Sequence, residues 1–142
     1  MKQRLLVVAI AAAFASGAHA QSTDDKTAIN QTSLDYIDGW YEGNAERMQR
    51  ALHPDLAKRI VTQKNTVNSM TAQRLIEQTR NGGGKDTPPE KHQKDVTILD
   101  VFGKAASVKV VAADWIDYMQ MGKVDGRWVI INVLWEMKPK AG

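Results

Sequence analysis

The stretch that decides the fold is residues 115–137, WIDYMQMGKVDGRWVIINVLWEM. Two runs rich in aromatic and β-branched residues flank Asp125-Gly126, a dipeptide that favours a two-residue turn. We therefore predict an antiparallel hairpin with strands over residues 115–121 and 128–137. A two-residue turn pairs Val124 with Arg127, and the register of the whole hairpin follows from that pair.

This register divides the hairpin into two faces, because successive side chains of a strand alternate. One face carries Trp128 and the pairs Met121–Ile130, Met119–Asn132, Asp117–Leu134 and Trp115–Glu136. The other carries the pairs Gln120–Ile131, Tyr118–Val133 and Ile116–Trp135. Both faces are substantially apolar, so both need a cover. We expect helices on the first face and a second copy of the chain on the second, through Ile131, Val133, Trp135 and Tyr118. A three-residue loop would instead exchange the two faces.

The residues before this hairpin predict further strands of the same sheet. Residues 96–102 and 105–112 flank Gly103-Lys104, and a turn there places one apolar set on the helix side: Thr97, Leu99, Val101, Ala106, Val108 and Val110. If the chain reverses at residues 113–114, Val110 lies opposite Asp117, which puts Asp117 on the helix side, and Val108 lies opposite Met119. A single bulged strand would place the same side chains on the helix side, so residues 105–121 form either a hairpin or one bulged strand.

The first half of the chain has the helical period instead. Apolar residues recur every three to four positions over residues 23–43, and Asn44 is placed to cap a second, short helix. A third helix begins at Ser69 or Thr71, whereas residues 56–61 are either a strand or a helical turn. Helices followed by an antiparallel meander indicate an α+β fold with the helices packed on a curved sheet.

The first 20 residues have the pattern of an export signal. Lys2 and Arg4 precede an apolar run of about 11 residues, and Ala18-His19-Ala20 forms a cleavage site. A membrane-spanning helix needs roughly 20 apolar residues, so we expect cleavage after Ala20 and no stable membrane association. The mature protein is then periplasmic or secreted. Its residues 21–142 are enough for a single domain with a core.

The charge balance excludes some partners and the composition excludes some chemistry. The chain has 19 basic and 16 acidic residues, and two of the basic ones lie in the export signal. With no basic cluster, nucleic acid is not expected as a partner. Cysteine is absent, which excludes disulfides, thiolate metal ligands and thiol nucleophiles.

The sequence contains no motif for a metal or a cofactor. After cleavage the only histidines are His53, which precedes a proline, and His92, which lies in an expected surface loop at residues 82–94. We therefore expect no metal site. Phosphate-binding, dinucleotide-binding and nucleophilic-serine motifs are also absent, so no cofactor is expected.

Asp117 is the strongest candidate for chemistry. Its neighbours at two residues' distance are Trp115 and Met119, Asn132 lies diagonally opposite, and the whole face is expected to be covered. A buried carboxyl must be paired, hydrogen-bonded or protonated. Desolvation raises the pKa of a carboxyl, which suits a general acid or base. The alternative is that Asp117 only stabilises the fold through a local hydrogen bond.

Aromatic residues extend this candidate site. Tyr36 and Trp40 share the buried face of the first helix, and a buried tyrosine hydroxyl needs a hydrogen-bond partner. We therefore propose Asp117 and Tyr36 as catalytic candidates. The candidate ligand contacts are Trp40, Trp115, Met119, Asn132 and Trp128. The competing interpretation is that these aromatic residues belong to the core.

Four segments in this order carry a family resemblance: Tyr36-x-x-Gly39-Trp40-Tyr41-x-Gly43-Asn44, Ala51-Leu52-His53-Pro54-Asp55, Trp115-Ile116-Asp117-Tyr118 and residues 125–135. Together they resemble the putative lumazine-binding family of the nuclear transport factor 2-like (SnoaL-like) superfamily, over nearly the whole mature chain. The resemblance implies a cone-shaped α+β half-barrel that encloses a hydrophobic pocket. It also implies homodimers formed through the outer face of the sheet.

Three functions fit this resemblance and the residues. The first is an exported, homodimeric protein that binds a small apolar or flat heteroaromatic ligand in its pocket. The second is an enzyme of the isomerase, dehydratase or cyclase class, with Asp117 as general acid or base and Tyr36 stabilising oxyanion charge. The third is a non-catalytic dimeric adaptor whose pocket is filled by its own side chains.

Overall fold

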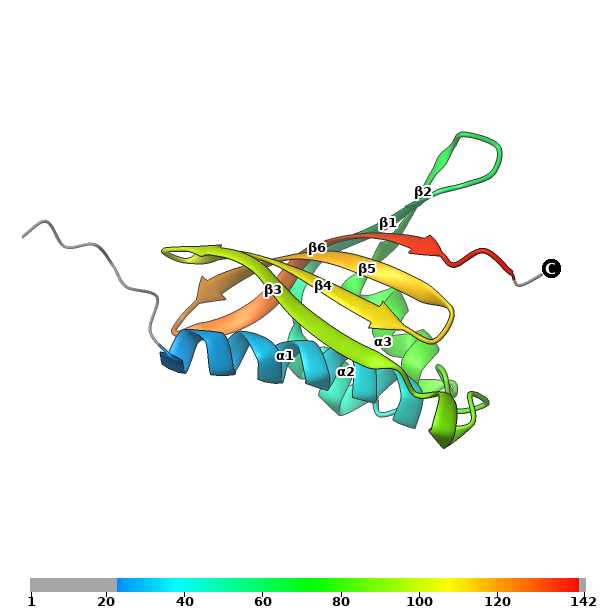
Figure 1. The fold of residues 1–142 in the computed structure, drawn as a ribbon, viewed down its shortest axis with the longest axis horizontal. Helices are drawn as coiled ribbons and strands as arrows, with labels where there is room; N and C mark the ends of the chain where they lie inside the picture. Colours follow the sequence, from blue (N-terminus) through cyan, green and yellow to red (C-terminus); the bar gives the residue numbers. More distant parts are fainter. Residues whose placement is uncertain (1–22, 141–142) are drawn as a thin grey trace, which may run out of the picture.

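The computed structural model describes residues 23–140, which form three α-helices and one six-stranded sheet (Figure 1). The strands lie in the order β2-β1-β6-β5-β4-β3, and the helices cover one face of this curved sheet. The predicted α+β class is therefore confirmed, whereas the proposed export signal lies outside the described residues. The elements in chain order are α1 (Thr23–Glu42), α2 (Ala45–Ala51), β1 (Leu52–Val61), β2 (Val67–Thr71), α3 (Ala72–Arg80), the 3-10 turn η1 (Pro89–Lys91), β3 (Lys94–Phe102), β4 (Ala105–Ala112), β5 (Trp115–Val124) and β6 (Arg127–Met137).

Helices α2 and α3 begin where the sequence offers a capping side chain. Asn44 Oδ1 accepts the backbone N–H of Arg47 at 3.1 Å at the start of α2, and Thr71 Oγ1 accepts that of Arg74 at the start of α3. The ambiguous residues 56–61 belong to strand β1, which runs parallel to β6. This parallel pair joins the helical half of the chain to the end of the meander. The pattern of residues within either segment cannot predict such a contact, because the two strands are far apart in the sequence.

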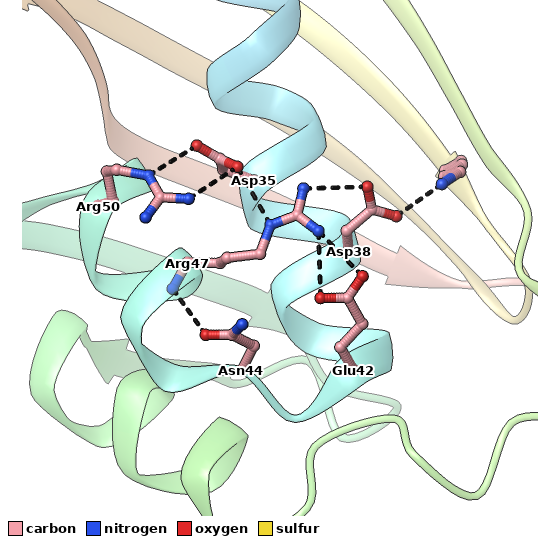
Figure 2. Close-up of polar contacts among 7 residues, drawn as sticks. Asp35, Asp38, Glu42, Asn44, Arg47 and Arg50 are labelled. Atoms are coloured by element: carbon pink, nitrogen blue, oxygen red, sulfur yellow. Dashed lines mark hydrogen bonds and ion pairs between the residues drawn. The ribbon is translucent and has the colours of Figure 1, made fainter.

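A charged cluster holds α1 against α2 (Figure 2). The Arg47 guanidinium donates to Asp35 at 3.2 Å, to Asp38 at 3.2 Å and to Glu42 at 2.9 Å, and Arg50 also donates to Asp35. Burial would raise the pKa of Asp35, but the hydrogen bonds and charges of the two arginines outweigh it and lower this pKa below its ordinary 3.8. The cluster fixes the rotation of α1, so its opposite face meets the sheet.

Strands β5 and β6 form the predicted hairpin, but a bulge at Ile131 changes its register. The pairs Val124–Arg127 and Met121–Ile130 are as predicted; the next pair is Gln120 with Asn132. All the predicted pairs beyond the bulge are therefore wrong: Met119–Asn132, Asp117–Leu134 and Trp115–Glu136 on one face, and Gln120–Ile131, Tyr118–Val133 and Ile116–Trp135 on the other. Asp117 instead lies opposite Trp135. An extra residue in one strand exchanges the faces of everything beyond it.

The bulge is explained by what each register buries. Without it, Asn132, Leu134 and Glu136 would face the helices, and an amide and a carboxyl would need partners in the core. With it, Val133 is 2% exposed on the helix side and Leu134 is 53% exposed on the outer side. Asn132 donates to Gln120 on that outer side, at 3.2 Å. The predicted outer-face set is thus wrong for Val133 and Trp135.

Strands β3, β4 and β5 complete the meander. The predicted turn at Gly103-Lys104 is confirmed, but a second bulge at Leu99 places Val96 and Ile98 opposite the buried Val110 and Val108. The predicted helix-side positions of Thr97 and Leu99 are therefore wrong. Strands β4 and β5 form a hairpin, and both predicted pairs, Val110–Asp117 and Val108–Met119, are confirmed.

Candidate functional site

Asp117 lies in the core with three hydrogen-bond donors around its carboxylate. Its side chain is 0% exposed, although it sits in the middle of an amphipathic strand. Lys58 Nζ lies 2.5 Å from Oδ1, while Oδ2 accepts the Trp115 indole N–H at 2.7 Å and the Tyr36 hydroxyl at 3.2 Å. The predicted position of Asp117 on the helix side is thus observed, and so is a tyrosine partner.

Lys58 supplies the positive charge of this group and was missed by the sequence analysis. Its side chain is 7% exposed, and its ammonium also donates to the Tyr36 hydroxyl at 2.6 Å. Burial lowers the pKa of Lys58, and the charge and hydrogen bond of Asp117 only partly oppose this. Lys58 lies two residues after the buried Leu56 along β1 and so shares its face, which means that a strand interpretation of residues 56–61 would have placed Lys58 on the inner face.

The Tyr36 hydroxyl, which comes from α1, is hydrogen-bonded to both Lys58 and Asp117. Burial raises its pKa well above the ordinary value of 10.0, and the negative charge of Asp117 and the hydrogen bond to it act in the same direction. The phenol is therefore a hydrogen-bond donor to Asp117 at neutral pH. Lys58, Asp117 and Tyr36 together form a group that carries no net charge.

The raised pKa of Tyr36 predicts a loss of stability in alkali. The unfolded chain releases this proton above pH 10.0, whereas the folded protein retains it, so folding becomes less favourable as pH rises past 10.0. We expect Tyr36→Phe to reduce the slope of unfolding free energy against pH in that range, as measured by urea unfolding on both sides of pH 10.0. Equal slopes in both proteins would contradict the assignment.

A pocket of about 570 Å³ opens above this group. Lys58 and Tyr36 belong to its wall, and so do the indole rings of Trp40, Trp115 and Trp135. Trp40 meets Trp115 edge to face, with ring centroids 6.4 Å apart, and the Lys58 ammonium lies 4.9 Å from the centroid of the Trp135 ring. The outer part of the wall comes from the segment after α3 and the β4–β5 turn: Gly83, Gly84, Asp86, Thr87, Pro88, Lys91, Ala113 and Asp114.

The segment after α3 packs closely on Trp40 because it contains glycine. The Gly84 amide donates to the Trp40 carbonyl at 2.8 Å. A Cβ at Gly83 would lie 2.6 Å from that carbonyl oxygen, and one at Gly84 would lie 2.7 Å from the indole ring. Only glycine permits this approach. Part of the predicted surface loop at residues 82–94 is therefore a wall of the pocket.

The other predicted ligand contacts lie elsewhere. Met119 is buried in the core below the pocket wall, and Asn132 faces outward beside Gln120. Trp128 lies near the start of α1, where its indole donates to Asp25 at 2.9 Å. Val133 takes the place expected for Asn132, opposite Met119, and Trp135 takes the place expected for Leu134, opposite Asp117, because the bulge at Ile131 shifts the register by one residue. A bulge of this kind has no signature in the alternation pattern, so Trp135 was assigned to the wrong face.

A second, larger groove lies away from the tryptophan pocket. A groove of about 1100 Å³ between α2, α3 and the β5–β6 turn has apolar side chains in its wall together with exposed charged ones, among them Glu46, Glu77, Arg80 and Arg127. Over residues 23–140, no three His, Asp or Glu side chains are grouped to hold a metal ion. Within the same range no helix is long and apolar enough to cross a bilayer.

Solved structures share this architecture at low sequence identity. An NTF2-like protein of unknown function from Shewanella baltica OS155 is 19% identical with a TM-score of 0.66, covering 82% of this chain and 96% of its own. One from Methylobacillus flagellatus KT is 23% identical with a TM-score of 0.65, covering 83% and 95%. A third, from Silicibacter pomeroyi DSS-3, is 12% identical with a TM-score of 0.63, covering 81% and 97%. These likenesses establish the NTF2-like fold. Among curated proteins, none matches the sequence.

The sequence of the domain also matches a family model. The model is described as "Putative lumazine-binding" and covers residues 24–136. This range includes every helix and strand except for Thr23, the first residue of α1, and Met137, the last residue of β6. The match spans the Lys58–Asp117–Tyr36 group and the three pocket tryptophans. The chain therefore belongs to the putative lumazine-binding family, and it has the fold of NTF2-like proteins.

Proposed function

We propose that this protein binds a small, flat heteroaromatic molecule between the pocket tryptophans. The observation that carries the proposal is the pocket itself, in which Trp40, Trp115 and Trp135 surround a floor made by Lys58 and Tyr36. Its volume, about 570 Å³, is in the range of small-molecule sites, which combine apolar walls with a few polar groups. The family description, which names lumazine, supports the same class of ligand.

The hydrogen bonds of Asp117 favour binding over proton transfer. A general base needs a free lone pair directed at the substrate. Both oxygens of Asp117 already accept hydrogen bonds, from Lys58 on one side and from Tyr36 and Trp115 on the other. These contacts stabilise the ionised carboxylate and enclose it. We therefore assign Asp117 the role of holding Lys58, Tyr36 and Trp115 in place under the ligand, in preference to an isomerase-like role.

Titration of the purified mature protein with lumazine tests the proposal. We expect saturable binding in isothermal titration calorimetry, together with a change in tryptophan fluorescence. Replacing Trp135 with alanine removes one stacking surface. Because stacking of a nucleobase on an aromatic ring contributes about 1–3 kcal/mol, the Kd for lumazine should rise roughly five- to a hundredfold.

Trp128→Phe is the matched control for that substitution. It also removes an indole, but this indole donates to Asp25 at the far end of α1 and does not line the pocket. Its Kd for lumazine should equal that of the unmodified protein. Failure of the unmodified protein to bind lumazine, or an equal loss in the two variants, would overturn the proposal.

We also propose that the outer face of the sheet forms a homodimer. Three large side chains on it are exposed, Leu99, Tyr118 and Leu134, and they border a shallow hollow of about 570 Å³. Such an apolar area on a soluble protein is typical of an interface between copies. Sedimentation should give a dimer for the unmodified protein and a monomer for Leu134→Asp. A monomer in both cases would contradict the proposal. Periplasmic or secreted localisation stays a prediction from residues 1–20.

A further inference from the structure

The Lys58 ammonium has one more N–H donor than it has acceptors. It carries three N–H groups. Over residues 23–140 it donates to two oxygens, Asp117 Oδ1 at 2.5 Å and Tyr36 Oη at 2.6 Å. The third N–H has no oxygen acceptor among these residues, and Lys58 lines the pocket with its ammonium 4.9 Å from the centroid of the Trp135 ring. The pocket floor can therefore offer one charge-assisted donor to a ligand.

The other buried donors beside Lys58 are already engaged. Tyr36 uses its proton on Asp117, and Trp115 uses its indole N–H on the same carboxylate. The oxygens of Asp117 already accept three hydrogen bonds and lie behind these side chains. A ligand atom that reaches Lys58 must therefore be an acceptor, such as a carbonyl oxygen.

The charges around the pocket favour a neutral acceptor. The positive charge of Lys58 is balanced by the carboxylate of Asp117, 2.5 Å away. The exposed charged residues of the outer wall are Asp86, Asp114 and Lys91, so the pocket as a whole carries one excess negative charge. An anionic ligand would lose hydration in a pocket whose net charge repels it. The two outer aspartates can instead accept from N–H or O–H groups of a ligand.

We infer that Lys58 is the specificity-determining residue of this pocket, and that it selects an uncharged heterocycle by donating to a ring carbonyl at the floor. The inference rests on the proposed function and adds an orientation to it. The carbonyl edge of the ligand points inward to Lys58, and its N–H or O–H groups point outward to the carboxylates at the mouth. Ligands that carry a carboxylate or phosphate are rejected.

Three related probes test the selection on the unmodified protein. Lumazine has two ring carbonyls, pteridine has the same ring system without them, and 6-carboxylumazine adds an anionic group. The calorimetry is done at a pH where lumazine carries no charge. A hydrogen bond to a charged group contributes enough for roughly tenfold or greater tighter binding of lumazine than of pteridine. We expect 6-carboxylumazine to bind more weakly than lumazine, and the difference to shrink as salt is added.

The variant Lys58→Met with Asp117→Asn tests whether Lys58 is the cause. The double substitution removes both charges together, and the amide oxygen introduced at position 117 can still accept from Tyr36 and Trp115. We expect this variant to bind lumazine and pteridine with about equal Kd values, because the contact between Lys58 and the ring carbonyl is lost. Lys104→Met is the matched control, because Lys104 is exposed at the β3–β4 turn and outside the pocket. It should keep the full preference.

The outcomes separate this inference from the proposed function. Failure of all three probes to bind overturns both. Lumazine binding that is equal to pteridine binding, or tighter binding of 6-carboxylumazine, overturns the role of Lys58 and leaves the pocket function standing. An unchanged preference in the folded double variant does the same, with folding checked by circular dichroism. Loss of the preference in the double variant alone supports the inference.

Discussion

Asp117→Asn should lower the free energy of unfolding by about 3 kcal/mol, because it leaves the buried Lys58 ammonium without its counter-ion. The substitution is nearly isosteric, so it opens no cavity. An amide also has one acceptor oxygen, whereas the three donors around Asp117 now share two. Urea unfolding followed by tryptophan fluorescence measures the change.

The double variant Lys58→Met with Asp117→Asn is the control for this result. It removes the cation along with its partner, so it should recover at least half of the lost stability. Replacement of a whole buried ion pair by neutral groups is often close to neutral. A double variant less stable than Asp117→Asn would contradict the account, since the loss would then come from packing or from hydrogen bonds alone.

Val133→Asp should destabilise the protein by about 4 kcal/mol, because the new carboxyl is buried on the helix side, where the neighbouring cation, Lys58 on β1, is already paired with Asp117. Val133 is 2% exposed and belongs to the main hydrophobic cluster. Thermal and urea unfolding report the loss. Failure to obtain folded protein at all would be the extreme form of the same result.

Asn132→Asp is the matched control, one residue away on the outer face. Within residues 23–140 its amide donates to Gln120 alone, so a carboxyl in its place should change the stability by less than about 0.5 kcal/mol. The pair of variants tests the bulge directly. Without the bulge at Ile131 the two side chains would exchange faces, and Asn132→Asp would then be the damaging substitution.

The same group of side chains links stability to recognition. Lys58, Asp117 and Tyr36 come from β1, β5 and α1, so their hydrogen bonds tie two strands of the sheet to the helix above it. A ligand that adds an acceptor to Lys58 would strengthen this connection. Ligand binding should therefore raise the midpoint of thermal unfolding, as for any ligand that binds only the folded state.

Much of the fold could be predicted from local sequence. The turns at Gly103-Lys104 and Asp125-Gly126, and the caps at Asn44 and Thr71, depend on the conformations of one to four residues. The burial of Asp117 and its contact with Tyr36 were also accessible, because the two hairpins placed this residue on the same face independently. The α+β class followed from these elements in their order.

The remainder was decided by contacts between distant segments. Lys58 and Asp117 are 59 residues apart in sequence, and they meet because β1 adds to the sheet in parallel beside β6. The bulges at Ile131 and Leu99 arise where strict alternation would bury polar side chains or expose apolar ones, a conflict that exists only once the helices cover the sheet. Local sequence thus determined which elements form and where they turn. Only the packed tertiary structure decided which side chains beyond each bulge face the pocket, because the energy of burial depends on what lies opposite.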